Sequence, residues 1–123
     1  MNAVLDTNIL IDFLKGHLSA KRELRRYDHP AISLITWMEI LVGAETEEEE
    51  HALRKFLSRF HLLQIENDVA ELAVSLRKTH RLRKPDAIIW SSAQSRNMVL
   101  VTRNTRDFPA DDPSIRVPYR LRS

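Results

Sequence analysis

The sequence predicts an α/β fold, specifically a three-layer α/β/α sandwich with a short, mainly parallel central sheet. Two observations lead to this prediction. Short apolar runs, each no longer than a strand, alternate along the chain with longer segments of helical periodicity. That alternation is typical of parallel sheets whose strands are connected through helices, which then cover both faces of the sheet.

Five segments are the expected strands. The clearest is the buried run from Met98 to Thr102, with the sequence MVLVT. The last is a short edge strand near Arg116 and Val117, in a segment otherwise rich in Pro and Asp. The other three expected strands are residues 2–5, 31–34 and 62–65.

Helical periodicity predicts six helices in the remaining segments. Thr7 or Asn8 is expected to cap the first, in which Ile9, Phe13 and Leu14 recur at helical spacing. The remaining helices are expected over residues 19–27, 36–42, 45–59, 68–81 and 85–93.

Length and composition exclude several classes of protein. With 123 residues the chain suffices for one core, so residues 1–123 are expected to form a single domain. No apolar run approaches the roughly 20 residues of a membrane-spanning helix, and no secretory signal precedes the first strand. We therefore expect a cytoplasmic protein without a membrane partner. The chain has no cysteine and only two glycines, which excludes thiolate chemistry and a Gly-rich phosphate-binding loop.

Charged residues are segregated along the chain, although the net charge is only +2. Bases gather in residues 21–26, 77–84 and 116–122, whereas acids gather in residues 45–50. Segregated basic stretches suit a surface that binds a polyanion such as nucleic acid. They are also typical of solvated helix faces, so they do not decide the function on their own.

Four acids that lie far apart in the sequence are expected at one edge of the sheet. Asp6 ends the first strand, and Asp107 lies just beyond the last buried strand. Glu39 and Asp86 lie in the first turns of two helices. In a parallel sheet the carboxyl ends of the strands lie at one edge, which is where α/β proteins form their sites. The sequence therefore predicts an acidic site at this edge.

Each acid also has a purely structural explanation. Thr36 and Glu39 have the spacing of a capping box, in which Glu39 would only bond the backbone amide of Thr36. Asp86 follows Pro85 at a helix start, where a negative charge complements the helix dipole. Asp6 could be an ordinary cap or turn residue, although it ends a buried run rather than a solvated turn.

The acids taken together favour a metal site over these separate explanations. Two carboxylates about 5 Å apart repel by roughly 3 kcal/mol at an effective dielectric near 20. Three such pairs would cost on the order of 10 kcal/mol, comparable to the whole stability of a domain. A fold that gathers them must protonate one acid or bind a cation. Oxygen ligands without His or Cys favour Mg²⁺, with Mn²⁺ as an alternative, and such an ion can assist phosphodiester hydrolysis.

Four sequence blocks around these acids resemble those of a known nuclease family. The blocks are LDTNIL at residues 5–10, Ser33-x-x-Thr36-x-x-Glu39-Ile40, PDAII at residues 85–89, and LVTRN at residues 100–104 followed by Asp107-Phe108. They resemble the four blocks of PIN-domain nucleases and cover nearly the whole chain. Their order and spacing are most similar to VapC-type toxins of VapBC toxin–antitoxin pairs, particularly the FitB-like branch.

The resemblance implies a PIN-like fold with an acidic pocket at the carboxyl edge of the sheet. It implies that Asp6, Glu39 and Asp86 are metal ligands and catalytic acids. Many relatives have a fourth acid where this chain has Asn104, so either Asn104 or Asp107 completes the site. The hydrogen-bonding residues expected to orient the acids are Thr7, Asn8, Thr102 and Asn104, for which simple capping or turn bonding is the alternative.

The function implied is a Mg²⁺-dependent ribonuclease toxin. Its RNA substrate would be held by Arg81, Arg83 and Lys84, which precede Asp86 and can contact backbone phosphates. The partners implied are a VapB-like antitoxin and a second copy in a homodimer, with a higher-order complex as an extension. DNA would be contacted only indirectly, through the antitoxin.

Two pairs of exposed or aromatic residues are candidates for partner contacts. Leu14 and Leu18 in the first two helices could dock the antitoxin, although ordinary core contacts are the alternative. Trp37 and Trp90 could stack on RNA bases, but aromatics in helices beside a sheet more often belong to the core.

Two other functions fit part of the sequence. A catalytically silent PIN-like binding protein is an alternative because Asn104 replaces an acid. A receiver-like signalling domain also places acids and Mg²⁺ at the edge of a parallel sheet. It would need an acidic pair after the first strand and a Lys after a late strand, where this chain has Arg103.

Overall fold

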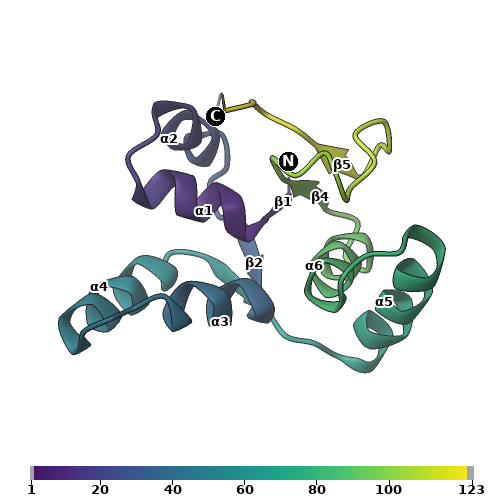
Figure 1. Cartoon of the computed structure of the whole chain (residues 1–123), viewed down its shortest axis with the longest axis horizontal. Coiled ribbons are helices and arrows are strands. Elements are labelled where there is room, and N and C mark those ends of the chain that lie inside the picture. The colour runs from purple at the N-terminus through teal and green to yellow at the C-terminus, as the bar shows by residue number, and fades with distance from the viewer. Residues whose placement is uncertain (1, 122–123) are drawn as a thin grey trace.

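A computed structural model describes residues 2–121 of the chain. Its centre is a sheet of five parallel strands in the order β3-β2-β1-β4-β5 (Figure 1). The strands are β1 (Ala3–Leu5), β2 (Ala31–Ser33), β3 (His61–Leu63), β4 (Val99–Val101) and β5 (Ile115–Arg116). All neighbouring pairs run parallel, so the expected sheet is confirmed and is wholly rather than mainly parallel in these residues.

Six helices connect the strands. They are α1 (Thr7–Leu14), α2 (Leu18–Arg25), α3 (Leu34–Val42), α4 (Glu47–Leu57), α5 (Asn67–His80) and α6 (Lys84–Gln94). Each coincides with an expected helix to within a few residues at either end. None of the helices described is long and apolar enough to span a bilayer.

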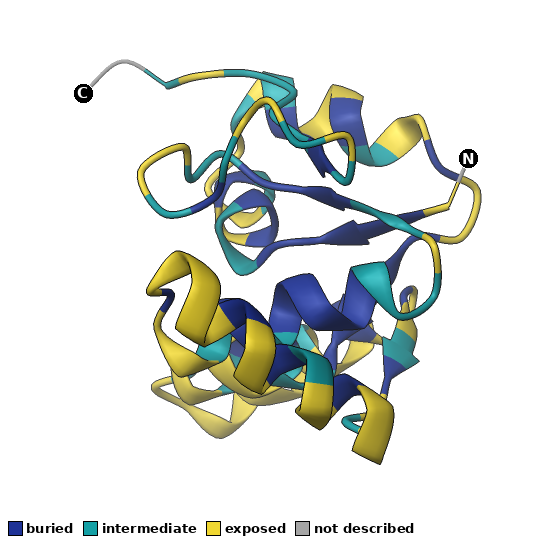
Figure 2. Cartoon of the chain, turned by 90° about the vertical axis from the view of Figure 1, so that its right-hand side faces the viewer, coloured by how far each residue is buried: buried dark blue, intermediate teal, exposed yellow. Residues whose placement is uncertain are grey.

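The helices cover both faces of the sheet, which confirms the three layers. Side chains in a strand alternate between faces, and neighbouring residues of one strand therefore enter different cores. Val4 and Leu100 pack with α5 and α6, whereas Leu5 and Val101 pack with α1 to α4. Figure 2 shows the buried strands enclosed between helices whose outer surfaces are exposed. Burial on both faces explains why the strands are apolar at consecutive positions.

The caps of helices α1 and α3 differ from the sequence predictions. Helix α1 is capped by Asp6, whose side chain accepts from the backbone amide of Thr7, and neither Thr7 nor Asn8 is the cap. Helix α3 begins at Leu34 and is capped by Ser33, two residues earlier than expected. Ser33 is both the last residue of β2 and the cap of α3, and Asp6 directly follows β1, so no separate turn lies between strand and helix in either case.

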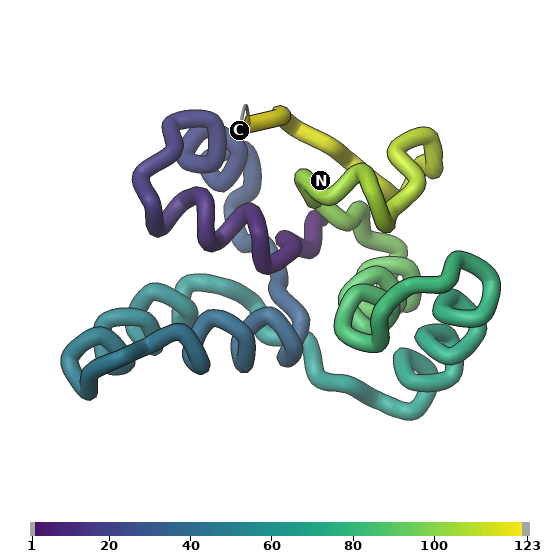
Figure 3. Tube along the Cα trace, viewed as in Figure 1, coloured from purple at the N-terminus to yellow at the C-terminus, as the bar shows by residue number. Residues whose placement is uncertain are grey.

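The C-terminal segment crosses back over the first two helices. After β5 the chain runs from the right of the molecule toward α2 (Figure 3). Arg116 pairs with Glu23 of α2, and the hydroxyl of Tyr119 donates to Asp12 of α1. These contacts hold residues 116–119 on the same face of the sheet as α1 and α2.

Candidate active site

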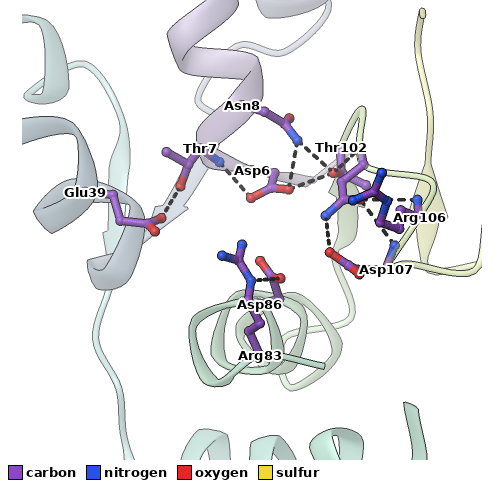
Figure 4. Close-up of polar contacts among 10 residues, drawn as sticks. Asp6, Thr7, Asn8, Glu39, Arg83, Asp86, Thr102, Arg106 and Asp107 are labelled. Atoms are coloured by element: carbon purple, nitrogen blue, oxygen red, sulfur yellow. Dashed lines mark hydrogen bonds and ion pairs between the residues drawn. The ribbon is translucent and has the colours of Figure 1, made fainter. Parts of the chain in front are cut away.

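Acids from separate elements face one another at the carboxyl edge of the sheet. Asp6 comes from the end of β1, Asp86 from the first turn of α6 and Glu39 from α3. Their carboxyl groups point into a common space, with Asp107 on its opposite side from Glu39 (Figure 4). The structure thus brings the four acids to one edge.

Asp6 is buried and tightly hydrogen-bonded. It is 4% exposed, and it caps α1 by accepting from the backbone amide of Thr7 at 2.8 Å. Its second oxygen accepts from the hydroxyl of Thr102 at 2.6 Å and from the amide of Asn8 at 3.4 Å. Thr102 follows β4, the neighbour of β1, so the sheet itself brings this hydroxyl to Asp6. These donors fix the direction of the carboxylate.

The environment of Asp6 makes its negative charge unfavourable. Burial raises the pKa of this carboxyl to about 6, from an ordinary value of 3.8. The hydrogen bonds from Thr102 and Thr7 act in the opposite direction, and the nearby charges of Asp86 and Glu39 raise the pKa further. A nearby cation therefore stabilises the ionised form of this buried carboxyl more than it would stabilise that of a solvated carboxyl.

Asp86 is the second buried acid of the site. It lies next to Pro85 at the start of α6 and is 5% exposed. Burial raises its pKa, the ion pair with Arg83 lowers it, and the charges of Asp107 and Glu39 raise it, so that the net direction is upward. Arg83 Nε lies 3.3 Å from Asp86 Oδ2. The helix dipole explanation accounts for the position of Asp86 but not for its burial.

Glu39 is held by a hydroxyl rather than by the backbone. Its Oε1 accepts from Thr7 Oγ1 at 2.6 Å, and Thr7 Oγ1 also lies 2.9 Å from Thr36 Oγ1. Thr36 lies inside α3 and is buried, while Ser33 is the cap and accepts from the amide of Ile35. The capping-box explanation of Glu39 is therefore wrong. Instead the exposed carboxylate of Glu39 is oriented from α1.

Asn104 and Asp107 form one unit after β4. Asn104 Nδ2 donates to Asp107 Oδ2 at 2.9 Å. Asn104 Oδ1 accepts from the backbone amides of Arg106 and Asp107, both at 3.2 Å. Its oxygen is thus occupied within the turn, whereas its amide holds the carboxylate of Asp107. Of the two residues, Asp107 is the one whose charge reaches Asp86.

The donor set suits a hard cation, but it does not enclose one by itself. The groups gathered here are carboxylate and hydroxyl oxygens, without His or Cys. Within residues 2–121 no three Asp, Glu, His or Cys side chains converge closely enough to hold one ion directly. An ion in this arrangement would therefore have one or two direct carboxylate ligands, with water as the others. Mg²⁺ commonly binds in this way.

The three bases before Asp86 have different positions. Arg81 ends α5 in a left-handed conformation, with φ at 56°, and is exposed. Arg83 precedes α6 and pairs with Asp86, while Lys84 begins α6 and is exposed. The ion pair of Arg83 was missed by the sequence prediction, although its spacing of three residues before Asp86 is that of neighbours on a helix.

The two tryptophans also differ. Trp90 is fully buried and donates from its indole nitrogen to Ser114, so it belongs to the core and cannot stack on a base. Trp37 is half-buried, and the guanidinium of Arg54 lies 5.2 Å from its ring centroid.

Comparison with known proteins relates this arrangement to nucleases. Residues 3–110 match the PIN domain family. The chain is 32% identical to the tRNA(fMet)-specific endonuclease VapC of Shigella flexneri over 116 residues, which cover 85% of this chain and 88% of that protein.

Two solved structures share the fold closely. One is a toxin–antitoxin complex from Klebsiella pneumoniae, with 45% identity and a TM-score of 0.90 over 97% of this chain and 99% of that one. The other is DNA-bound VapBC from Salmonella typhimurium, with 28% identity and a TM-score of 0.80 over 94% of this chain and 96% of that one. The acidic edge thus lies in a fold that toxins of such complexes share.

Proposed function

The chain belongs to the PIN-domain family, as a VapC-type endoribonuclease of a toxin–antitoxin pair, and from this premise we propose how its acidic edge acts. The observation that carries the proposal is the state of Asp6. This carboxyl is buried, fixed by Thr102 and Thr7, and raised in pKa to about 6 beside Asp86 and Glu39. Membership in the PIN family excludes the receiver-like alternative.

We propose that Asp6 and Asp86 hold one Mg²⁺, with Mn²⁺ as a substitute, and that Glu39 contacts it through water. The two buried acids are oriented by their neighbours, and the solvent-exposed Glu39 lies beyond them. When bound, the ion supplies positive charge for the scissile phosphate and favours deprotonation of the attacking water. A cation there would also offset the burial, and the smaller effect of the charges of Asp86 and Glu39, that raise the pKa of Asp6.

Glu39 positions or deprotonates the attacking water in this proposal. Its carboxylate is exposed and accepts a single described hydrogen bond from a side chain, that of Thr7. One carboxylate oxygen is therefore left to accept from a water molecule. Asp107, held by Asn104, adds negative charge on the other side of the site and is the proposed fourth acid.

RNA is proposed to reach the site across the bases that precede Asp86. Arg81 and Lys84 are exposed and free to contact phosphates on either side of the cut. Arg83 has two proposed roles. It pairs with Asp86 in the absence of RNA, and it contacts a backbone phosphate when RNA is bound.

The proposed partner is a VapB-like antitoxin. Leu14 and Leu18 are 44% and 59% exposed, so they are not core residues. A groove lined by Ile11, Leu14 and Leu53 also includes Glu39, so a segment bound there would reach the acids. An arginine of that segment could replace the cation.

Three further assignments belong to the same proposal. The chain is proposed to act as one PIN-like domain, residues 1–123, in a homodimer that binds DNA only through the antitoxin. The Salmonella relative is a VapBC complex bound to DNA. We also propose that the chain belongs to the FitB-like branch of the family, which the order and spacing of the four sequence blocks support.

The decisive experiment maps new RNA ends after brief expression of the toxin in cells. The wild type is expected to produce discrete cleavage sites, and purified protein is expected to cleave the same RNA with Mg²⁺ and to stop with EDTA. Asp6→Asn is the control and is expected to produce none. Cleavage by Asp6→Asn at the wild-type rate would refute the site assignment. RNA binding without Mg²⁺-dependent cleavage would instead indicate a silent binding protein.

A further inference from the structure

Two buried acids lie outside the acidic edge, and the first is Asp12 of α1. Asp12 is 2% exposed, and it accepts two hydrogen bonds from Arg103, at 2.7 Å from Nε and 3.0 Å from Nη2. The hydroxyl of Tyr119 donates to the same carboxylate at 2.8 Å. A buried carboxylate is thus fully paired with a bidentate arginine and a tyrosine, which is the arrangement that keeps it ionised.

Glu23 of α2 is held in the same way. It is 4% exposed and accepts two hydrogen bonds from Arg116, at 2.8 and 3.0 Å. The hydroxyl of Tyr27 donates to it at 2.7 Å. Both clusters pair a buried carboxylate with an arginine and a tyrosine, and Glu23 has Arg26 as a further cation at 3.8 Å. Each cluster ties the C-terminal part of the chain to one of the first two helices.

The two clusters differ in where their arginine lies relative to the acidic edge. Arg116 is the last residue of β5, and its backbone carbonyl accepts from the amide of Thr102 at 3.0 Å as part of the sheet, whereas the described hydrogen bonds of its side chain go to Glu23 alone. Arg103 lies between Thr102, which donates to Asp6, and Asn104, whose backbone amide donates to Thr102 Oγ1 at 3.0 Å. The backbone amide of Arg103 also donates to Asn8 Oδ1 at 3.3 Å.

We propose that Asp12 is a positioning residue of the acidic site, which holds the Thr102 hydroxyl on Asp6 by anchoring Arg103 to α1. The inference rests on the proposed metal site at Asp6. Asp12 contacts neither Asp6 nor Asp86 through any described hydrogen bond, and it acts through two intermediate residues, Arg103 and Thr102. Groups that orient metal ligands commonly change metal affinity when they are removed.

The paired state of Asp12 supports this role. Burial would raise the pKa of this carboxyl, but the hydrogen bonds from Arg103 and Tyr119 and the charge of Arg103 outweigh burial and lower it. The pair is therefore ionised at neutral pH, and its two-point geometry restricts the rotation of Arg103. A neutral isostere at position 12 would keep the volume and lose the anchor.

The test measures Mn²⁺ binding by calorimetry or electron paramagnetic resonance on the full chain without RNA. Asp12→Asn is expected to weaken binding roughly tenfold, in the range seen when partners of metal ligands are lost. Glu23→Gln is the matched control, because it breaks the corresponding cluster around a carboxylate of similar burial. It is expected to leave the affinity for Mn²⁺ unchanged. Equal loss in both variants, or no loss in Asp12→Asn, would overturn the proposal.

A double variant tests the route through Thr102. If Asp12 acts by holding that hydroxyl, Thr102→Val should weaken Mn²⁺ binding alone, and Asp12→Asn should then add little to it. If the double variant instead loses affinity by the product of the two single losses, the route through Thr102 is overturned. If Asp12→Asn does not fold, Arg103→Lys is tested in its place, because it replaces the two-point contact of the guanidinium by the point charge of an ammonium. It is expected to weaken Mn²⁺ binding by less than the loss expected for Asp12→Asn. Wild-type affinity in folded Arg103→Lys would then refute the role of the anchor.

The same measurement separates this inference from the proposed function. Asp6→Asn is expected to abolish Mn²⁺ binding. If Asp6→Asn binds as the wild type does, or if the wild type does not bind, the metal site and the inference both fail. If Asp6→Asn loses binding while Asp12→Asn keeps it, the inference alone fails.

Discussion

Arg83 Nε lies 3.3 Å from Asp86 Oδ2, so the guanidinium of Arg83 forms an ion pair with one of the two acids proposed to hold the metal. The two side chains are unequal, because that of Asp86 is 8% exposed and that of Arg83 is 75% exposed. An exposed arginine can leave a buried carboxylate without disturbing the core. The ion pair therefore stabilises the negative charge of Asp86 in the metal-free protein, and it can separate when a metal ion binds.

Arg83→Gln is expected to tighten metal binding and to weaken RNA binding. An exposed ion pair contributes about 0.2–1 kcal/mol, so removal of the competing guanidinium should strengthen Mn²⁺ binding by up to roughly fivefold. The KM for RNA should rise, because one phosphate contact is lost. Lys84→Gln is the control and should raise KM alone. Weaker metal binding in Arg83→Gln would contradict the competition.

Asp6→Asn is expected to stabilise the metal-free protein at neutral pH. The pKa of Asp6 is raised, so folding favours its protonated form, and the free energy of unfolding falls as pH rises from about 4 to about 6. The difference between about 6 and 3.8 corresponds to at most about 3 kcal/mol. Asparagine removes this cost.

Thermal unfolding at two pH values measures the effect. At pH 7.5 without metal, Asp6→Asn should have the higher Tm, and near pH 4 the two proteins should unfold alike. Mg²⁺ should raise the Tm of the wild type and leave that of the variant unchanged. A variant less stable than the wild type at both pH values would show that the hydrogen bonds of Asp6 outweigh its charge.

The sequence was sufficient for the fold class because its signals are local. The periodicity of 68–81 and the apolar run 98–102 each identify one element without knowledge of the others. The strand order could not be predicted, because it depends on which strands pair across long stretches of chain. The caps were misplaced since Ser33 is also the last residue of β2 and Asp6 follows β1 directly, so no turn separates either strand from its helix.

The site was predictable where topology alone places the residues. Asp6 and Asp86 could be expected at one edge because strand ends and helix starts meet there. The hydroxyls that hold the acids depend on side-chain directions, and the Thr7 bond to Glu39 joins residues 32 positions apart. The anchor of Arg103 on Asp12 spans 91 positions and has no local sequence signal.

Metal affinity is expected to depend on pH with a break near the pKa of Asp6. A proton and a metal ion compete for this carboxylate, so the apparent Kd should rise about tenfold per pH unit below about pH 6 and stay constant above it. Asp86, whose pKa is also raised, should steepen the dependence at lower pH. Calorimetric titration with Mn²⁺ between about pH 5 and 8 measures this. A constant Kd over that range would rule out Asp6 as the competing ligand.

Thr7→Val should separate the role of Glu39 from metal binding. The hydroxyl of Thr7 donates the one described side-chain hydrogen bond to Glu39, at 2.6 Å, whereas Asp6 accepts from the backbone amide of Thr7. Valine has nearly the same shape and keeps that amide, so metal affinity should change little. The Tm should fall, because the buried hydroxyl of Thr36 loses its partner. If Glu39 orients the attacking water, kcat should fall roughly tenfold or more.

Thr7→Ser is the matched variant, because it keeps the hydroxyl and loses a methyl group. It should retain most of the activity, whereas Glu39→Gln should lose more than Thr7→Val, since the amide cannot accept a proton. Single-turnover cleavage at saturating Mg²⁺ and enzyme gives the rate constant of the chemical step without a contribution from metal affinity or product release. Equal rates for Thr7→Val and the wild type would mean that Glu39 holds its position without the hydroxyl, or that it acts only as a distant charge. In the second case Glu39→Gln should also retain most of its activity, and the attacking water would have to be oriented by another acid of the site, of which Asp107 is the remaining one. In the first case Glu39→Gln should still lose its activity.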